Sequence, residues 1–89
     1  MNTIEITYAD GSKKTYDMIA AGYAAYSYKN AAGRTAIMVG KIEGDKISFM
    51  KDTFVKERDS NEIDEIKEML DFEGFSISAE VVNQYILNS

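Results

Sequence analysis

Apolar and polar residues alternate in the first part of the chain as they do in paired β-strands. Ile4, Ile6 and Tyr8 fall on one face of an extended segment whose other face is polar. Asp10-Gly11 follows at once, and such a pair favours a hairpin turn because glycine tolerates a positive φ. The segment 13–18 then predicts the returning strand. The chain is therefore expected to open with a β-hairpin.

The next segment carries two periodicities. Several residues from Met18 to Tyr26 fit a helical stripe, whereas those from Tyr26 to Lys29 alternate like a strand. We expect a short helix over about 18–24, followed by a strand that ends at Lys29. The small and polar residues of 30–33 then predict a hairpin loop.

The middle of the chain predicts the clearest strands. Residues 34–42 and 46–50 are rich in Ile, Met, Val and Phe at alternating positions, and Gly44-Asp45 between them favours a turn. Gly40 lies inside the first of these strands. A glycine there predicts a β-bulge.

After Val55 the pattern becomes helical. Asp59 and Glu62 form a variant of the capping box, and apolar residues then recur at helical spacing. We expect a helix over about 60–71, with Gly74 as its stop, and Ser78 as the N-cap of a second helix. The apolar side of that second helix consists of Val81, Val82, Tyr85 and Ile86.

Strands followed by helices predict an α+β fold. We expect an antiparallel sheet of about five strands with the C-terminal helices packed on one face. A chain of 89 residues, 45% hydrophobic and 28% charged, has enough apolar surface for a modest core and is close to the average globular charge content. Residues 1–89 are therefore expected to form a single domain.

Negative charge is concentrated in one segment of the chain. Residues 57–73 hold eight acids and two bases, which leaves seven of the 15 acids and eight of the 10 bases for the other residues. The segment therefore carries −6 and the other residues +1, so the net charge of −5 is due to this segment. A block of one sign is often a solvated helix face that serves solubility, but it is also the part most able to select a partner by charge.

A row of carboxylates on a rigid helix can take the place of nucleic-acid phosphates on a basic surface. This leads to the hypothesis of a small inhibitor that binds a protein partner with a basic surface, such as a nucleic-acid-processing complex. Small acidic proteins of phages and mobile elements, including many anti-CRISPR proteins, act in this way, and the likeness is one of size and charge. The expected contact face consists of Glu62, Asp64, Glu65, Glu68 and Asp71.

Tyrosines interleaved with bases suggest a second surface on the sheet. Aromatic and basic side chains on strands can stack and neutralise single-stranded nucleic acid, and tyrosine is also enriched at protein interfaces. A sequence pI near 4.6 argues against direct nucleic-acid binding, and tyrosines that shield the rim of a core explain the pattern equally well. The alternative interface consists of Tyr16, Tyr26, Tyr28, Lys29 and Arg34.

The chain contains neither Cys nor His, so sulfur-ligated metals, thiolate nucleophiles and Ser-His-Asp triads are excluded. Its acids at turns lack the ligand series of a calcium loop, and its glycines lack phosphate-loop spacing. We therefore expect a protein that is not an enzyme and has no cofactor and no metal. The N-terminus lacks the pattern of a secretory signal, and the sequence has no apolar run of membrane-spanning length, which favours a cytoplasmic location.

Overall fold

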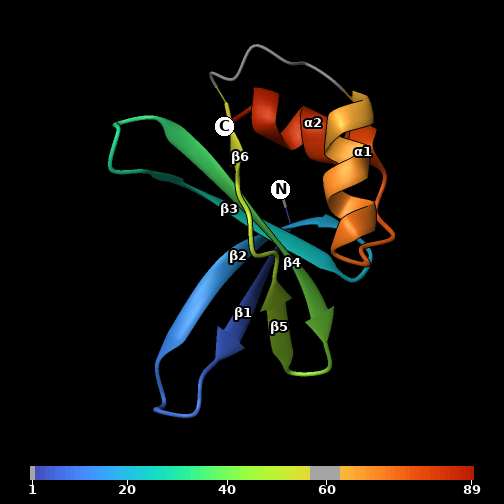
Figure 1. Cartoon of the computed structure of the whole chain (residues 1–89). Helices are drawn as coiled ribbons and strands as arrows, with labels where there is room; N and C mark the ends of the chain where they lie inside the picture. Colours follow the sequence, from blue (N-terminus) through green and yellow to red (C-terminus); the bar gives the residue numbers. More distant parts are fainter. Residues whose placement is uncertain (1, 57–62) are drawn as a thin grey trace.

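The structure, a computed structural model, describes residues 2–56 and 63–89. Within these ranges the chain forms six β-strands followed by two α-helices (Figure 1). In chain order these are β1 (Thr3–Thr7), β2 (Lys13–Ala20), β3 (Tyr23–Lys29), β4 (Thr35–Glu43), β5 (Lys46–Phe49), β6 (Phe54–Val55), α1 (Ile63–Phe72) and α2 (Ala79–Leu87). The predicted α+β fold is confirmed.

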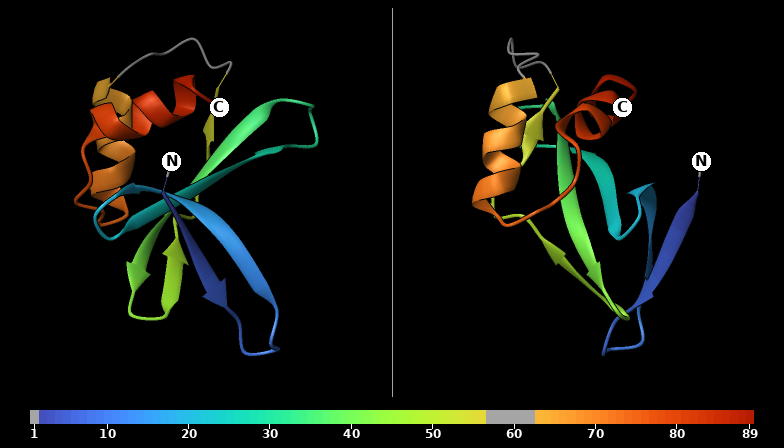
Figure 2. Two further views of the ribbon diagram at one scale, coloured as in Figure 1. Left: turned by 180° about the vertical axis from the view of Figure 1, so that it is seen from behind. Right: turned by 90° about the vertical axis from the view of Figure 1, so that its right-hand side faces the viewer.

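The sheet is antiparallel, and strands that follow one another in the chain are neighbours in the order β1-β2-β3-β4-β5. The β3–β4 hairpin is the longest pairing, from Tyr23 opposite Lys41 to Lys29 opposite Thr35. β5 and the short β6 both pair with β4, and since β3 occupies its other edge, they lie one after the other on the same side. Figures 1 and 2 show the sheet curling, with the β1–β2 and β4–β5 hairpins extending away from the helices.

The predicted helix over 18–24 is wrong. β2 continues to Ala20, and a turn with Gly22 at a φ of 82° leads directly into β3 at Tyr23. Residues on both sides of this turn face two different hydrophobic clusters. Ile19, Tyr23 and Ala25 pack in one, and Met18 and Ala24 in the other. Strands that are buried on both faces lose their polar positions, and a short apolar run of this kind cannot be told from a helix by its period.

The predicted bulge at Gly40 is also wrong. Gly40 pairs in register with Ala24 on β3 and with Phe49 on β5, and the irregularity in the sheet lies in β2 instead, between Met18 and Ala20. Gly40 is required for close packing. A Cβ at this position would lie 2.7 Å from Cγ1 of Ile47 and 2.8 Å from Cδ1 of Phe49, which is closer than carbon atoms pack.

Both C-terminal helices form as predicted, with small shifts. α1 ends at Phe72, and the N–H of Phe75 beyond Gly74 donates to the carbonyl of Leu70, a bond that satisfies one of the last carbonyls of the helix. The predicted start of this helix, including the pair Asp59 and Glu62, lies outside the described residues. Ser78 does precede α2, but its hydroxyl donates to the Glu80 carboxylate at 2.8 Å rather than capping the backbone.

The helices cover one face of the sheet, as predicted. Buried residues of α1 and α2 join those of β3, β4 and β6 in the main core, where Ile37, Val39, Leu70 and Val82 are the largest side chains that are fully buried. Two tyrosine hydroxyls at the helix–sheet boundary add hydrogen bonds. The Tyr23 hydroxyl accepts from the N–H of Ser76 at 2.8 Å, and the Tyr85 hydroxyl donates to the Asp17 carboxylate at 2.6 Å.

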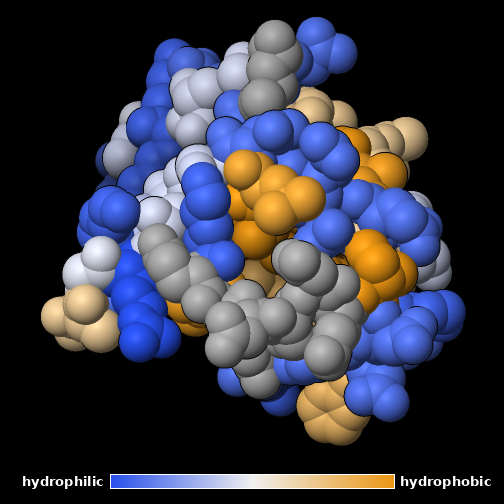
Figure 3. Space-filling view, turned by 90° about the horizontal axis from the view of Figure 1, so that it is seen from above, coloured by the Kyte–Doolittle hydropathy of each residue, from blue (hydrophilic) through white to orange (hydrophobic). Residues whose placement is uncertain are grey.

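The surface around the helices is mostly polar. Viewed from the end where α1 and α2 lie, small hydrophobic patches are separated by hydrophilic residues (Figure 3). In residues 2–56 and 63–89, no helix is long and apolar enough to cross a membrane.

Candidate functional site

The acids predicted on the first C-terminal helix are presented to solvent along one face of α1. Successive helical residues are about 100° apart, so the burial of Ile66 and Leu70 against the core turns Asp64, Glu68 and Asp71 outward, and all three are exposed. We call these three residues the acidic face. Two further acids were predicted to belong to it: Glu65 is half-buried, and Glu62 lies outside the described residues.

The acidic face carries one base. Lys67 Nζ lies 2.7 Å from Asp71 Oδ2, and this hydrogen bond and the charge of Asp71 raise the pKa of Lys67 above its usual value. Two like-charged pairs remain, Asp64 with Glu68 and Glu68 with Asp71, at the spacings where helical neighbours meet. Each such pair destabilises a helix by about 0.2–0.5 kcal/mol. α1 also has no base in its last turn, where the helix dipole favours positive charge. The charges of the acidic face therefore lower the stability of α1 slightly and do not help the chain to fold.

Phe72 is an aromatic residue on the same face that was not predicted from the sequence. Its side chain is 86% exposed, more than that of any other large apolar residue in the parts of the chain that the structure describes. It follows Glu68 by four positions, the spacing of residues stacked on one side of a helix. Helical spacing could have predicted that Phe72 is exposed, because it places Phe72 away from the stripe of Ile66 and Leu70 that faces the core.

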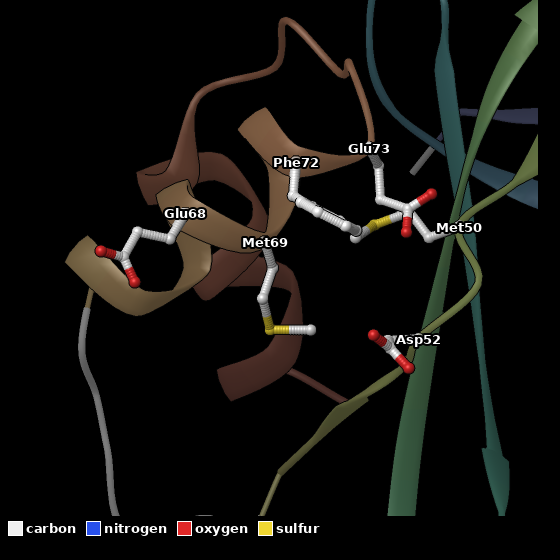
Figure 4. A pocket seen from close by; sticks show the side chains of 6 residues that line it. All are labelled: Met50, Asp52, Glu68, Met69, Phe72 and Glu73. Carbon is white, nitrogen blue, oxygen red and sulfur yellow. The ribbon is translucent and has the colours of Figure 1, made fainter.

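A pocket of about 170 Å³ lies beside Phe72, between α1 and the segment that follows β5. Its lining consists of Met50, Asp52, Glu68, Met69, Phe72 and Glu73. In Figure 4, Met69 and Phe72 project from α1 toward the segment with Met50 and Asp52, whereas the Glu68 carboxylate turns away at the outer side of the helix. Among the lining residues that the structure describes, three are acids and none is a base. The acidic face thus ends in an apolar pocket with an acidic rim.

The tyrosines of the alternative interface pack against one another on the face of the sheet opposite the main core. Tyr16 and Tyr26 have ring centroids 5.4 Å apart, Tyr26 and Tyr28 5.8 Å, and Phe49 meets both Tyr16 and Tyr26 edge-on at 5.5 Å. Tyr16 is only 6% exposed. Because these rings pack against one another, their faces are not all free to stack on a ligand. They form the rim of a second core.

The alternative interface is therefore divided. Tyr16 is buried, whereas Tyr28, Lys29 and Arg34 are exposed around the β3–β4 loop. The ammonium group of Lys29 donates to the Thr35 hydroxyl at 2.9 Å, which directs it along the hairpin. The structure does not gather these five residues on one open surface.

Burial of the tyrosine cluster has a consequence for stability at high pH. Desolvation, together with the 2.5 Å hydrogen bond between the Tyr8 and Tyr16 hydroxyls, raises the pKa of Tyr16 from 10.0 to about 12. Since the folded state holds this proton more tightly, its contribution to stability is complete below pH 10 and is lost as the pH rises toward 12. We expect urea unfolding to show a fall in stability across this window that is smaller in Tyr16→Phe. An equal fall in both proteins would contradict the assignment to Tyr16.

Acidic side chains that meet at one point could also bind a metal ion. No group of three or more acidic side chains in residues 2–56 and 63–89 is arranged to hold a metal ion. What the acidic face and the pocket provide is negative charge beside exposed apolar surface. This combination suits binding to a positively charged macromolecule.

Comparisons with known proteins found no matching family model, no matching curated protein and no matching solved structure.

Proposed function

We propose that this protein is a binding protein without enzymatic activity, whose acidic face docks on a basic surface of a protein partner. In its concrete form the partner is a nucleic-acid-processing complex of the cytoplasm, and the protein inhibits it as a phage or mobile-element protein of the anti-CRISPR kind would. One observation carries the proposal: three exposed carboxylates and a largely exposed Phe72 share one face of α1.

The physical argument combines two contributions. The carboxylates meet Lys and Arg side chains that otherwise hold phosphates, and such complementarity speeds the encounter and selects the partner. Charge alone adds little affinity at an exposed surface, because salt and water screen it. Phe72 supplies apolar area that becomes buried on docking, which is the usual source of affinity. A helix kept acidic only for solubility has no need of an exposed aromatic residue.

The proposal is tested by affinity capture with mass spectrometry, followed by purification of the captured protein. We compare the parent with a neutralised variant that carries Asp64→Asn, Glu68→Gln and Asp71→Asn. The matched control carries Glu5→Gln, Asp45→Asn and Glu80→Gln, the same charge change at exposed positions on other elements. We expect the parent and the control to capture a nucleic-acid-binding protein, and the neutralised variant to lose it, with capture weakened by salt. Equal capture by all three proteins would make the acidic face a solvated surface.

A second candidate is an accessory interaction domain that binds through its sheet. In the described strand pairs, β2 and β3 meet only from Asp17 to Ala20 and from Tyr23 to Ala25. The remainder of each strand therefore has one edge without a strand partner, and an open edge can accept a strand of another protein. This candidate predicts that the neutralised variant binds as well as the parent, and that changes at Tyr28 weaken binding.

A further inference from the structure

Phe72 needs an explanation that the acidic face alone does not give. Phe72 lines the edge of the pocket at the end of α1, yet the residue remains 86% exposed. Burying such a ring is among the larger favourable contributions that a single residue makes. An exposed ring beside a preformed pocket is typical of a residue that completes its packing against a partner.

The pocket beside Phe72 differs chemically from the rest of the helix surface. Met50, which is buried, and Met69, which is partly buried, provide an apolar floor, and thioethers adapt their shape to an inserted side chain. Asp52 and Glu73 add carboxylates to this lining, whereas the Glu68 carboxylate turns away from the pocket (Figure 4). Figure 4 shows the Asp52 carboxylate facing the space that Met69 and Phe72 enclose. The volume of about 170 Å³ corresponds to roughly six water molecules at ~30 Å³ each, enough for one long side chain.

We propose that this pocket receives one arginine side chain of the partner, with its guanidinium over the ring of Phe72. The proposal rests on the function proposed above, since it names the anchor by which the basic partner would be held. An arginine fits each part of the site. Its methylene stem packs on apolar surface, its planar cation stacks on an aromatic face, and its fork of N–H donors matches carboxylates.

Charge complementarity selects arginine over the other occupants. A neutral apolar side chain would fill the floor but leave the carboxylates of Asp52 and Glu73 without a counter-charge, and an acidic one would be repelled by them. Lysine carries the same charge, but its ammonium is more strongly hydrated and lacks the planar face that stacks on a ring. The pocket is therefore expected to prefer arginine to lysine by shape, and arginine to neutral or acidic side chains by charge.

The test uses short peptides as probes and needs no identified partner. A peptide with one central arginine is titrated into the ¹⁵N-labelled protein, beside two peptides in which that residue is lysine or citrulline, the neutral isostere of arginine. We expect the arginine peptide to shift the amide signals of Met50, Asp52, Met69 and Glu73, the lysine peptide to do so several-fold more weakly, and the citrulline peptide to have no effect. Equal shifts with arginine and citrulline, or shifts elsewhere only, would overturn the proposal.

Variants separate this inference from the proposed function. Phe72→Leu keeps an apolar side chain but removes the aromatic face, and we expect it to weaken arginine binding by roughly twofold to fivefold, the range of an exposed cation–π contact. Leu87→Ala, which changes a half-exposed apolar residue on α2, is the matched control and should bind as the parent does. If Phe72→Leu binds the arginine peptide like the parent while the neutralised variant loses partner capture, the pocket inference fails and the proposed function stands. If the neutralised variant keeps capture, the proposed function fails whatever the peptides show.

Discussion

Replacing Leu70 with alanine is expected to lower the free energy of unfolding by about 2–5 kcal/mol, the range for removing a buried leucine side chain. Leu70 is 1% exposed and lies in the main core with Ile37, Val39 and Val82. The substitution removes apolar contacts and leaves a cavity that the surrounding strands and helices can only partly fill. Chemical denaturation followed by circular dichroism measures the change.

The matched control for this prediction is Leu87→Ala on α2. Leu87 is 50% exposed, so the same chemical change removes much less buried surface and is expected to cost at most about 0.5 kcal/mol. A loss of similar size in both variants would mean that α1 does not hold its place through Leu70. In that case, the outward direction of the acidic face would lose its structural basis.

Reversing the charge of the acidic face is expected to have the largest effect on binding. Asp64→Lys together with Glu68→Lys places two ammonium groups against the basic surface of the partner, and like charges brought together at an interface cost several kcal/mol. We therefore expect the affinity for the captured protein to fall by about 100-fold or more. Titration calorimetry with the purified partner measures it.

The free energy of unfolding of the variant shows whether a loss of affinity is due to unfolding. Both changed positions are exposed. The substitutions exchange one like-charged pair for another and give position 68 a charge opposite to that of Asp71, so the free energy of unfolding of the variant is expected to stay within ~0.5 kcal/mol of that of the parent. Asp45→Lys with Glu80→Lys gives the same charge change elsewhere and should retain most of the affinity. Full affinity in the α1 variant would contradict a contact through the acidic face.

The fold could be predicted from the sequence where an element has a clear period or a run of strand-forming residues. The hairpin around Gly11, β5 and the two helices have a period, β4 is rich in Ile, Met and Val although it is buried on both faces, and the structure has them all. The exception is the segment from Met18 to Tyr26. Its residues are covered on both sides of the sheet, so polar positions that would show the strand period are missing.

The role of Gly40 could not be predicted from the sequence for a different reason. A glycine in a strand indicates either a bulge or a close approach of other atoms, and the choice depends on which side chains of the neighbouring strand lie opposite. Here Ile47 and Phe49 lie over it. This contact depends on the register between β4 and β5, which the hydrophobic pattern alone did not specify.

The candidate site was predicted only in its charged part. Helical spacing was enough to place Asp64, Glu68 and Asp71 on one face, because a helix fixes its own geometry. The pocket joins α1 to residues of the segment after β5, such as Met50 and Asp52. That segment lies beside α1 only in the folded chain, so no local pattern could indicate the contact. In the alternative interface, the burial of Tyr16 in the second core likewise depends on contacts between strands, which no local pattern indicates.

The most direct test of the central claim is a competition for the partner between this protein and nucleic acid. A labelled nucleic acid is bound to the purified partner, and the parent protein is added while fluorescence anisotropy is recorded. If the acidic face occupies the basic surface, the parent releases the nucleic acid at equal stoichiometry, the neutralised variant does not, and release weakens as salt increases. Formation of a ternary complex with the nucleic acid still bound would contradict the claim.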